Sequence, residues 1–409
     1  MATVSGNLPR PLPEAPTGFR LWWQRHTNTR AAYLYLIPAF AVMAIITFYP
    51  MGYQVWMSFT DYGVKSLNPN SKTYQAPNVV GVQNYSDIFK GDLAKKVQNF
   101  DFWKLLTFNL VWTFTNVPVH VVLGVLIAVL LNTQGLWFKR AYRAIYILPI
   151  VIPTLVVATV WKNLFDPQSG GVNKLLATAF GPLIRAGQAM GLFQNVDLDT
   201  FFRIRWFDQI DAPFFADAKL PIASFWMVVA VAVVVSLVLI RLRVPYSTPI
   251  CLALGALVLG YGIIALEMPL SYYAMLIANI WLGWPFMTIV ATGALQSIPL
   301  DLYEAASIDG ASPRQQFMAI TVPLLRPAVI PAAMLGVITT FNLFNFVYMM
   351  SAGGPIRKTE IMVTTAYSLV RGNQLYGVAA AFCVIIFFVL LGLTLLTNGI
   401  TRGTERYDV

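Results

Sequence analysis

Charge is scarce in this chain. Of its 409 residues, 57% are hydrophobic and only 11% are charged, whereas ordinary soluble domains carry about 25% charged residues. The mean hydropathy of +0.63 agrees with that deficit. The scarcity argues against an ordinary soluble domain. It favours an integral membrane protein built of apolar helices, and we predict an all-α fold.

Residues that build disulfides and metal sites are almost missing. Cys251 and Cys383 each lie inside an apolar run, where a free thiol behaves as a small hydrophobe. His26 and His120 share no ligand-like spacing with them. The sequence therefore predicts no disulfide, no metal site and no catalytic residue.

A phosphate-binding loop of the form G-x-x-x-x-G-K-[ST] is absent as well. If this chain takes part in active transport, ATP with its Mg²⁺ must be bound and hydrolysed by another polypeptide, and no cofactor is expected in this one.

The net charge is +10. The basic residues form no stripe interleaved with aromatics, so nucleic acid is not expected as a partner. Lysine and arginine at the cytoplasmic ends of membrane helices explain the excess better, because they orient such helices.

Long runs without charge supply the candidate membrane helices, each of which needs about 20 mostly apolar residues. Eight such runs occur, at residues 31–60, 105–138, 144–161, 220–240, 244–266, 268–300, 327–356 and 372–401. We predict about eight transmembrane helices surrounded by lipid. The closely spaced pair at 220–266 is expected to form a hairpin.

The basic residues orient these helices. If the chain starts in the cytoplasm and alternates sides, its short basic loops all fall inside, as the positive-inside rule requires. These loops hold Lys139, Arg140 and Arg143, then Arg241 and Arg243, then Arg314 and Arg326, then Arg402 and Arg406. Residues 1–30 and 402–409 are then cytoplasmic, and residues 61–104 and 162–219 cap the outer face.

No Asp, Glu, Lys or Arg lies in the middle of any of the eight runs. Intramembrane charges usually mark an ion or proton pathway. Their absence counts against a carrier coupled through carboxylates, although backbone carbonyls could still bind sodium.

Two amides stand out inside the apolar run 327–356. Asn342 and Asn345 are three apart and are expected on one helix face. Hydrogen bonding between helices would explain them. So would a polar solute in a central cavity, and both interpretations stay open.

Residues 297–327 form a polar stretch between two apolar runs, and its capping residues and its proline predict two short helices. Asp301 suits the positive end of a first helix, and Gly310 supplies a left-handed cap that ends it. Ser312 and Gln315 form a capping box that starts a second helix. Pro323 is expected to break that second helix.

The same stretch carries a family resemblance. Its spacing, Glu304-Ala305-Ala306, three residues, Gly310, nine residues, Ile320 and Pro323, resembles the "EAA" loop of ABC-importer membrane subunits. Val322 stands where that family usually has leucine. Further similarity to carbohydrate permeases lies in Leu36-Ile37-Pro38, Asn84-Tyr85, Leu148-Pro149 and Gly353-Gly354-Pro355. Residues 341–348 most resemble the larger permease of maltose transporters.

The resemblance implies a type I ABC-importer permease core of six helices, here with an inserted hairpin (residues 220–266), in a bacterial or archaeal inner membrane. Its expected partners are a second permease, a dimer of ATPase subunits, an extracytoplasmic binding protein and a sugar. The implied ATPase-coupling residues are Glu304, Ala305, Ala306, Asp309, Gly310, Ile320 and Pro323. The implied sugar contacts are Asn342, Phe344, Asn345 and Tyr348.

Other functions stay open at this point. An ion-coupled secondary transporter or a channel would need no ATPase, and a membrane scaffold or receptor would transport nothing. The sugar is also open: maltose or maltodextrin is expected first, and the uncharged membrane runs disfavour a charged solute.

Overall fold

The fold is described from a computed structural model over residues 33–133, 135–190, 197–198, 202–210, 220–241 and 247–402. Over these residues the secondary structure is helical, apart from one isolated bridge between Thr60 and Val79. The chain divides into two compact units, residues 1–57 and 58–409, and each is described by itself. The prediction of an all-α membrane protein is confirmed.

The first unit contains one described apolar helix, Tyr33–Ser58, whose last residue belongs to the second unit. This helix includes a π turn, η1 (Ala44–Phe48), followed by α2 (Tyr49–Ser58).

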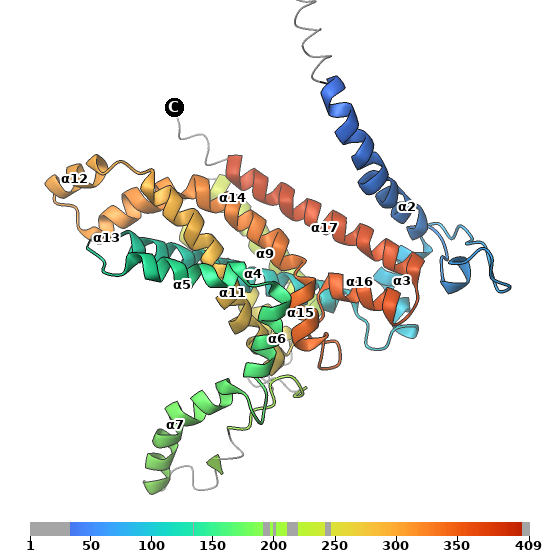
Figure 1. The fold of residues 1–409 in the computed structure, drawn as a ribbon, viewed down its shortest axis with the longest axis horizontal. Coiled ribbons are helices and arrows are strands. Elements are labelled where there is room, and N and C mark those ends of the chain that lie inside the picture. The colour runs from blue at the N-terminus through green and yellow to red at the C-terminus, as the bar shows by residue number, and fades with distance from the viewer. Residues whose placement is uncertain are drawn as a thin grey trace, which may run out of the picture. The chain divides into compact units, whose positions relative to one another are not determined.

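The second unit holds the remaining elements (Figure 1). They are η2 (Val64–Ser66), α3 (Gln83–Lys90), η3 (Asp92–Lys95), α4 (Phe102–Asn132), α5 (Lys139–Val151), α6 (Thr154–Leu164), α7 (Gly171–Ala189), α9 (Ile222–Arg241), α10 (Ser247–Ala265), α11 (Leu270–Gln296), α12 (Asp301–Ile308), α13 (Pro313–Gln316), η4 (Phe317–Thr321), α14 (Val322–Phe341), α15 (Phe344–Ser351), α16 (Met362–Arg371) and α17 (Tyr376–Arg402).

Five described helices are long and apolar enough to cross a membrane, or six if the bent pair α5–α6 counts as one span. The hairpin predicted at residues 220–266 exists as α9 and α10, which are shorter apolar helices packed against each other. The count of eight spans stays a prediction. So do both cytoplasmic termini, because residues 1–32 and 403–409 lie outside the described part of the chain.

The run 144–161 is not one straight helix. α5 and α6 meet at an angle of 98°. Ile152 at the junction is extended, with ψ of 129°, and Pro153 precedes the first residue of α6. Proline disfavours the helical conformation in the residue before it, so the sequence Ile152-Pro153 accounts for the corner. The run expected as the third membrane helix therefore forms two helices with a corner between them, and its role as one span stays a prediction.

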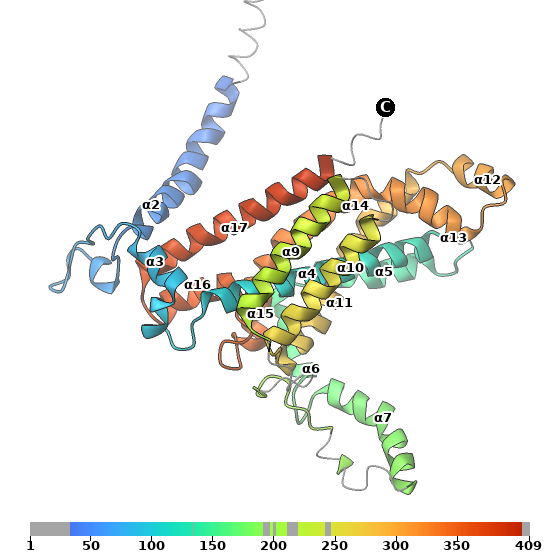
Figure 2. The same cartoon turned by 180° about the vertical axis from the view of Figure 1, so that it is seen from behind.

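The core of the second unit is the contact of α4 with α11, joined by α14 (Figure 2). α4 and α11 run in the same direction, since Trp112 contacts Tyr272 near one end and Ala128 clusters with Leu295 near the other. His120 Nε2 lies 3.0 Å from the carbonyl oxygen of Asn279, in the middle of the interface. Small residues allow this close approach: a Cβ on Gly283 would overlap the His120 ring.

Candidate functional site

The polar stretch 297–327 folds into a helical elbow, as the sequence predicts. α12 ends in a Schellman motif: the N–H of Ala311 donates to the Ala306 carbonyl at 2.9 Å, and the N–H of Gly310 donates to the Ser307 carbonyl at 3.1 Å. Gly310 has φ of +80°, the left-handed region that favours glycine. This turn fixes the direction in which the chain leaves α12.

The second helix starts at the predicted capping box. The N–H of Ser312 donates to Gln315 Oε1 at 2.7 Å, and the N–H of Gln315 donates to Ser312 Oγ at 3.4 Å. Both ends of the elbow are therefore determined by residues within a few positions of one another, which is why the sequence alone could place them.

Pro323 does not break this helix, and that expectation was wrong. Residues Pro313–Phe341 form one continuous helix. The π turn η4 ends two residues before Pro323, and the Val322 N–H donates to the Phe317 carbonyl. Proline cannot donate a backbone hydrogen bond, and a wider turn before it lets the helix continue. The second arm of the elbow is thus the start of the long helix that includes α14.

Two side-chain contacts tie α12 to this long helix. The hydroxyls of Tyr303 and Thr321 lie 2.9 Å apart, and Thr321 is buried. Gln316 Nε2 donates to Ser307 Oγ at 2.9 Å and to the Ala311 carbonyl at 3.1 Å. A displacement of α12 would therefore pull on the base of α14. The sequence analysis did not single out these residues.

The predicted coupling residues divide into two groups. Glu304, Ala305, Asp309 and Gly310 are exposed, and Ala306 is partly buried. Ile320 and Pro323 are partly buried, and Ile320 packs against the cluster at the ends of α4, α11 and α14. The exposed group is thus available to a partner, and Ile320 supports the base of the elbow.

The far end of α14 is a helix break. α14 stops at Phe341, and α15 begins at Phe344 after Asn342 and Leu343. α4 stabilises that end: Asn109 Nδ2 donates to the Phe341 carbonyl at 3.2 Å, and Trp112 Nε1 donates to the Thr340 carbonyl at 3.3 Å. Because a helix end leaves carbonyls without partners, these buried donors allow the chain to break here.

The break changes the interpretation of the two amides. The sequence predicts that the two amides share one helix face, and this prediction is wrong. Asn342 caps α14, whereas Asn345 lies in α15. Asn342 Nδ2 donates to the Ile338 carbonyl of its own helix at 3.4 Å. Asn345 is exposed and makes no hydrogen bond to the described chain through its side chain.

An aromatic cluster lies beside the break, made of Phe344, Tyr348 and Tyr367. Phe344 and Tyr348 are stacked, with ring centroids 5.2 Å apart and planes inclined by 14°. Tyr367, from α16, lies 5.1 Å from Phe344 and 5.2 Å from Tyr348. Tyr348 and Tyr367 are 36% and 37% exposed, so the cluster presents ring surface to its surroundings.

Sequence reasoning named Phe344 and Tyr348 but missed Tyr367. It lies outside the apolar runs that were searched. Tyr367 could have been noticed as an aromatic residue in an amphipathic helix, α16, which buries Met362 and Leu369 on its other positions.

The segment after α15 folds into a tight loop, as its glycines suggest. Gly353 has φ of +84°, and Thr359 Oγ1 donates to the Gly354 carbonyl at 2.6 Å. The loop holds Glu360 in a buried position, where it pairs with Arg357 at 2.6 Å and accepts a hydrogen bond from Thr365 at 2.6 Å. Burial raises the pKa of Glu360, while the Thr365 hydrogen bond and the Arg357 charge oppose that shift.

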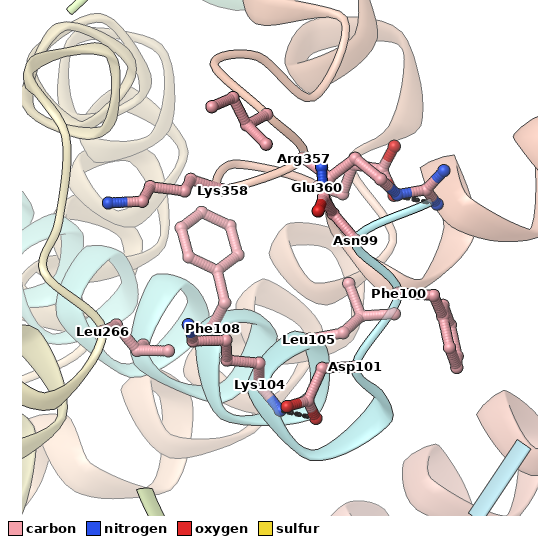
Figure 3. A pocket seen from close by; sticks show the side chains of 11 residues that line it. Asn99, Phe100, Asp101, Lys104, Leu105, Phe108, Leu266, Arg357, Lys358 and Glu360 are labelled. Atoms are coloured by element: carbon pink, nitrogen blue, oxygen red, sulfur yellow. Dashed lines mark hydrogen bonds and ion pairs between the residues drawn. The ribbon is translucent and has the colours of Figure 1, made fainter. Parts of the chain in front are cut away.

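A cavity of about 200 Å³ lies beside this loop (Figure 3). Its lining residues are Asn99, Phe100, Asp101, Lys104, Leu105, Phe108, Leu266, Ile356, Arg357, Lys358 and Glu360. Lys358 already bonds the Ile210 carbonyl at 3.1 Å and lies 3.5 Å from a carboxylate oxygen of Glu267. Charged groups of both signs therefore line this face.

The geometry of the loop gives a stability prediction for Gly353→Ala. A Cβ on Gly353 would overlap Glu360 Cγ. The substitution should cost the left-handed penalty of about 1–2 kcal/mol and a further overpacking term of about 1–3 kcal/mol. Gly91→Ala is the matched control, because Gly91 has φ of +83° with nothing within 4 Å of a Cβ. Thermal unfolding in detergent should give Gly353→Ala the lower apparent Tm, and equal values would contradict the packing of Glu360 on Gly353.

Comparison with known proteins adds three findings. The sequence profile of the family "Binding-protein-dependent transport system inner membrane component" matches residues 120–402. The maltodextrin transport system permease protein MdxF of Bacillus subtilis is 24% identical over 371 residues, covering 89% of this chain and 67% of the relative. The diacetylchitobiose uptake system permease protein DasB of Streptomyces coelicolor is 26% identical, covering 89% of this chain and 84% of the relative.

The fold is also similar to a solved structure. A chain of a bacterial ABC transporter involved in the import of the acidic polysaccharide alginate superposes with a TM-score of 0.59 at 17% identity. The match covers 93% of this chain and 98% of the other, so it extends over nearly the whole of both folds.

Proposed function

Because this chain belongs to the family of binding-protein-dependent transport system inner membrane components, we propose that it is the membrane-spanning permease subunit of an ATP-driven sugar importer. Family membership makes it a multi-pass membrane transport subunit rather than an enzyme, and it confirms the resemblance to ABC-importer permeases. The observation that carries the proposal is one continuous helix, Pro313–Phe341, which joins the exposed elbow to the helix break beside the aromatic cluster.

The elbow is the proposed docking point for a separate ATPase subunit. α12 presents Glu304 and Ala305 to its surroundings, and Ile308 at its end is 87% exposed. A small residue at the surface lets a partner approach closely, and an exposed large apolar residue gives it something to bury. ATP and Mg²⁺ are bound by that partner, whose closure would move α12.

Movement of α12 would reach the sugar site through α14. The Tyr303–Thr321 and Gln316–Ser307 contacts join α12 to the base of the long helix. The other end of that helix is Asn342. An effector shifts a two-state equilibrium only through different contacts in the two states, and the break at Asn342 is where the helix can change its relation to α15.

The break is the proposed place of sugar contact. Phe344, Tyr348 and Tyr367 would stack on the apolar faces of a sugar ring, and the amides of Asn342 and Asn345 would bond its hydroxyls. Irregular backbone at membrane depth is tolerated where it lines a cavity or is buried in protein, which fits a helix break beside a solute path. A neutral oligosaccharide is proposed, with maltodextrins as the first candidates.

The remaining partners are a second permease subunit and an extracytoplasmic binding protein. The cavity beside Lys104 and Lys358 lies at the same end of α4 as the loop that follows α15, and we place the binding protein's contact on this face.

Reconstitution tests the function. The chain is placed in liposomes with its copurifying permease and ATPase subunits, and uptake of labelled maltodextrins is measured with binding protein outside. Uptake is expected only with ATP in the compartment that holds the ATPase subunits, and the chain alone should hydrolyse no ATP. Robust flux through the chain alone under an ion gradient would instead indicate a secondary transporter or channel.

The contact between Tyr303 and Thr321 gives a separate prediction. Tyr303→Phe removes one neutral hydrogen bond, worth about 1 kcal/mol, and keeps the ring. We expect the ATPase to bind normally, while sugar uptake per ATP hydrolysed falls about fivefold. Ser297→Ala is the control, because Ser297 Oγ donates only to the nearby Ala294 carbonyl. Unchanged coupling in Tyr303→Phe would contradict a route through Thr321.

A further inference from the structure

Helix α7 carries a surface that the transport mechanism does not use. Along one stripe, at spacings of four, four, three and four residues, lie Leu175, Ala179, Leu183, Ala186 and Met190. Leu175 is 72% exposed, Leu183 66% and Met190 73%. Apolar side chains at this spacing share one helix face, and here that face is not covered by the described chain.

The charges of α7 are of one sign. Lys174 and Arg185, eleven residues apart, lie on a second stripe, and both are exposed. The helix Gly171–Ala189 contains no aspartate or glutamate. An apolar stripe flanked only by cations is typical of a helix that lies in the plane of a membrane surface with anionic lipids.

The start of α7 is anchored where an apolar helix ends. Asn173 Oδ1 accepts a hydrogen bond from Trp206 Nε1 at 2.8 Å, and Asn173 Nδ2 donates to the Ile204 carbonyl at 3.1 Å. Trp206 in turn packs on Phe165, with ring centroids 4.9 Å apart, and Phe165 directly follows α6. Tryptophan is enriched at membrane–water boundaries, so an anchor built on Trp206 fits a position at the membrane surface.

The direction of α7 agrees with this position. In both views α7 runs across the direction of α17 and projects from the bundle beyond α6, and Figure 2 shows that it also runs across the direction of α9 (Figures 1 and 2). A helix that crosses the direction of the membrane spans at their end lies along the membrane surface rather than through it.

We propose that α7 is an interfacial helix: it lies in the headgroup region of the bilayer, with Leu175, Leu183 and Met190 in the acyl boundary and Lys174 and Arg185 on anionic lipid headgroups. A single lipid surface accounts for both stripes at once. This inference does not depend on which solute is transported.

The test measures the depth of two labelled positions on opposite sides of α7. Leu183→Cys and Thr178→Cys are made separately in a Cys251→Ala/Cys383→Ala background, and each is spin-labelled in the complete transporter in nanodiscs. The discs contain phosphatidylcholine with about 30% phosphatidylglycerol. Accessibility of the label to oxygen, which enters lipid, is compared with accessibility to a water-soluble nickel chelate.

The Leu183 label is expected to be accessible to oxygen and protected from nickel, and the Thr178 label is expected to be accessible to nickel. Nickel access at both positions would show a water-exposed helix and overturn the proposal. Protection of Leu183 from both reagents would show that protein covers it, either the binding protein or the second permease, and would also overturn it.

Charge is tested by Lys174→Gln/Arg185→Gln in the Leu183→Cys background. Each cation near an anionic surface contributes about 1 kcal/mol. The ratio of lipid-buried to water-exposed label should therefore fall about thirtyfold in the double variant. Discs of phosphatidylcholine alone should produce the same fall without the substitutions. If neither the double substitution nor the removal of phosphatidylglycerol lowers this ratio, the assignment to anionic lipid is overturned.

Discussion

Ala305→Trp is expected to abolish sugar uptake while leaving the permease folded in the membrane. Ala305 is exposed in the middle of α12, so a larger side chain can point away from the described chain. At the centre of the proposed docking surface it would hold the partner away from Glu304 and Ile308. Disrupting a central contact costs about 2 kcal/mol or more, so the ATPase subunit should bind at least about thirtyfold more weakly.

Uptake and copurification are measured together for this variant. Ala189→Trp is the control, because Ala189 is exposed at the end of α7, and the same enlargement there should leave ATPase binding intact. Normal uptake by Ala305→Trp would remove the docking role of α12. Loss of the protein from the membrane would point to folding, and Ala305→Ser, which should keep both uptake and copurification, distinguishes that case.

The elbow shows which features could be predicted from sequence. Gly310 and the pair Ser312–Gln315 act on backbone groups within three to five positions of themselves, so their roles depend on local chemistry. The hydrophobic runs were equally local, and they predicted the positions of α4, α11 and α17. Pro323 misled because a preceding π turn accommodates it.

The candidate sugar site depends on contacts that no local pattern carries. The end of α14 is stabilised by Asn109 and Trp112, which precede it by 232 and 228 residues. Asn342 and Asn345 therefore appear from sequence to lie in one uninterrupted apolar helix. Tyr367 joins Phe344 only because α16 folds back beside α15. Long-range packing, rather than helix propensity, determines this site.

A substitution in the aromatic cluster is expected to have the second large effect on sugar uptake. Tyr348→Ala removes the ring that stacks on Phe344 and contacts Tyr367. An aromatic contact contributes about 0.5–1.5 kcal/mol beyond the area it buries, and the lost area adds to that. We expect the maltodextrin concentration for half-maximal uptake to rise about tenfold or more, with ATPase copurification unchanged.

Because the three rings pack against one another, a double substitution tests whether they act as one unit. Tyr348→Ala/Tyr367→Ala should weaken uptake by less than the product of the single effects, because residues in contact are not additive. Tyr348→Phe should retain most uptake if ring stacking is the main contribution, and should lose as much as Tyr348→Ala if the hydroxyl is. Phe387→Ala is the control, since Phe387 is 52% exposed and its ring contact is with Phe388 of its own helix, α17, rather than with the aromatic cluster. Equal losses at Phe387 and Tyr348 would show a general effect on the helices, and the break after α14 would then not be the sugar site.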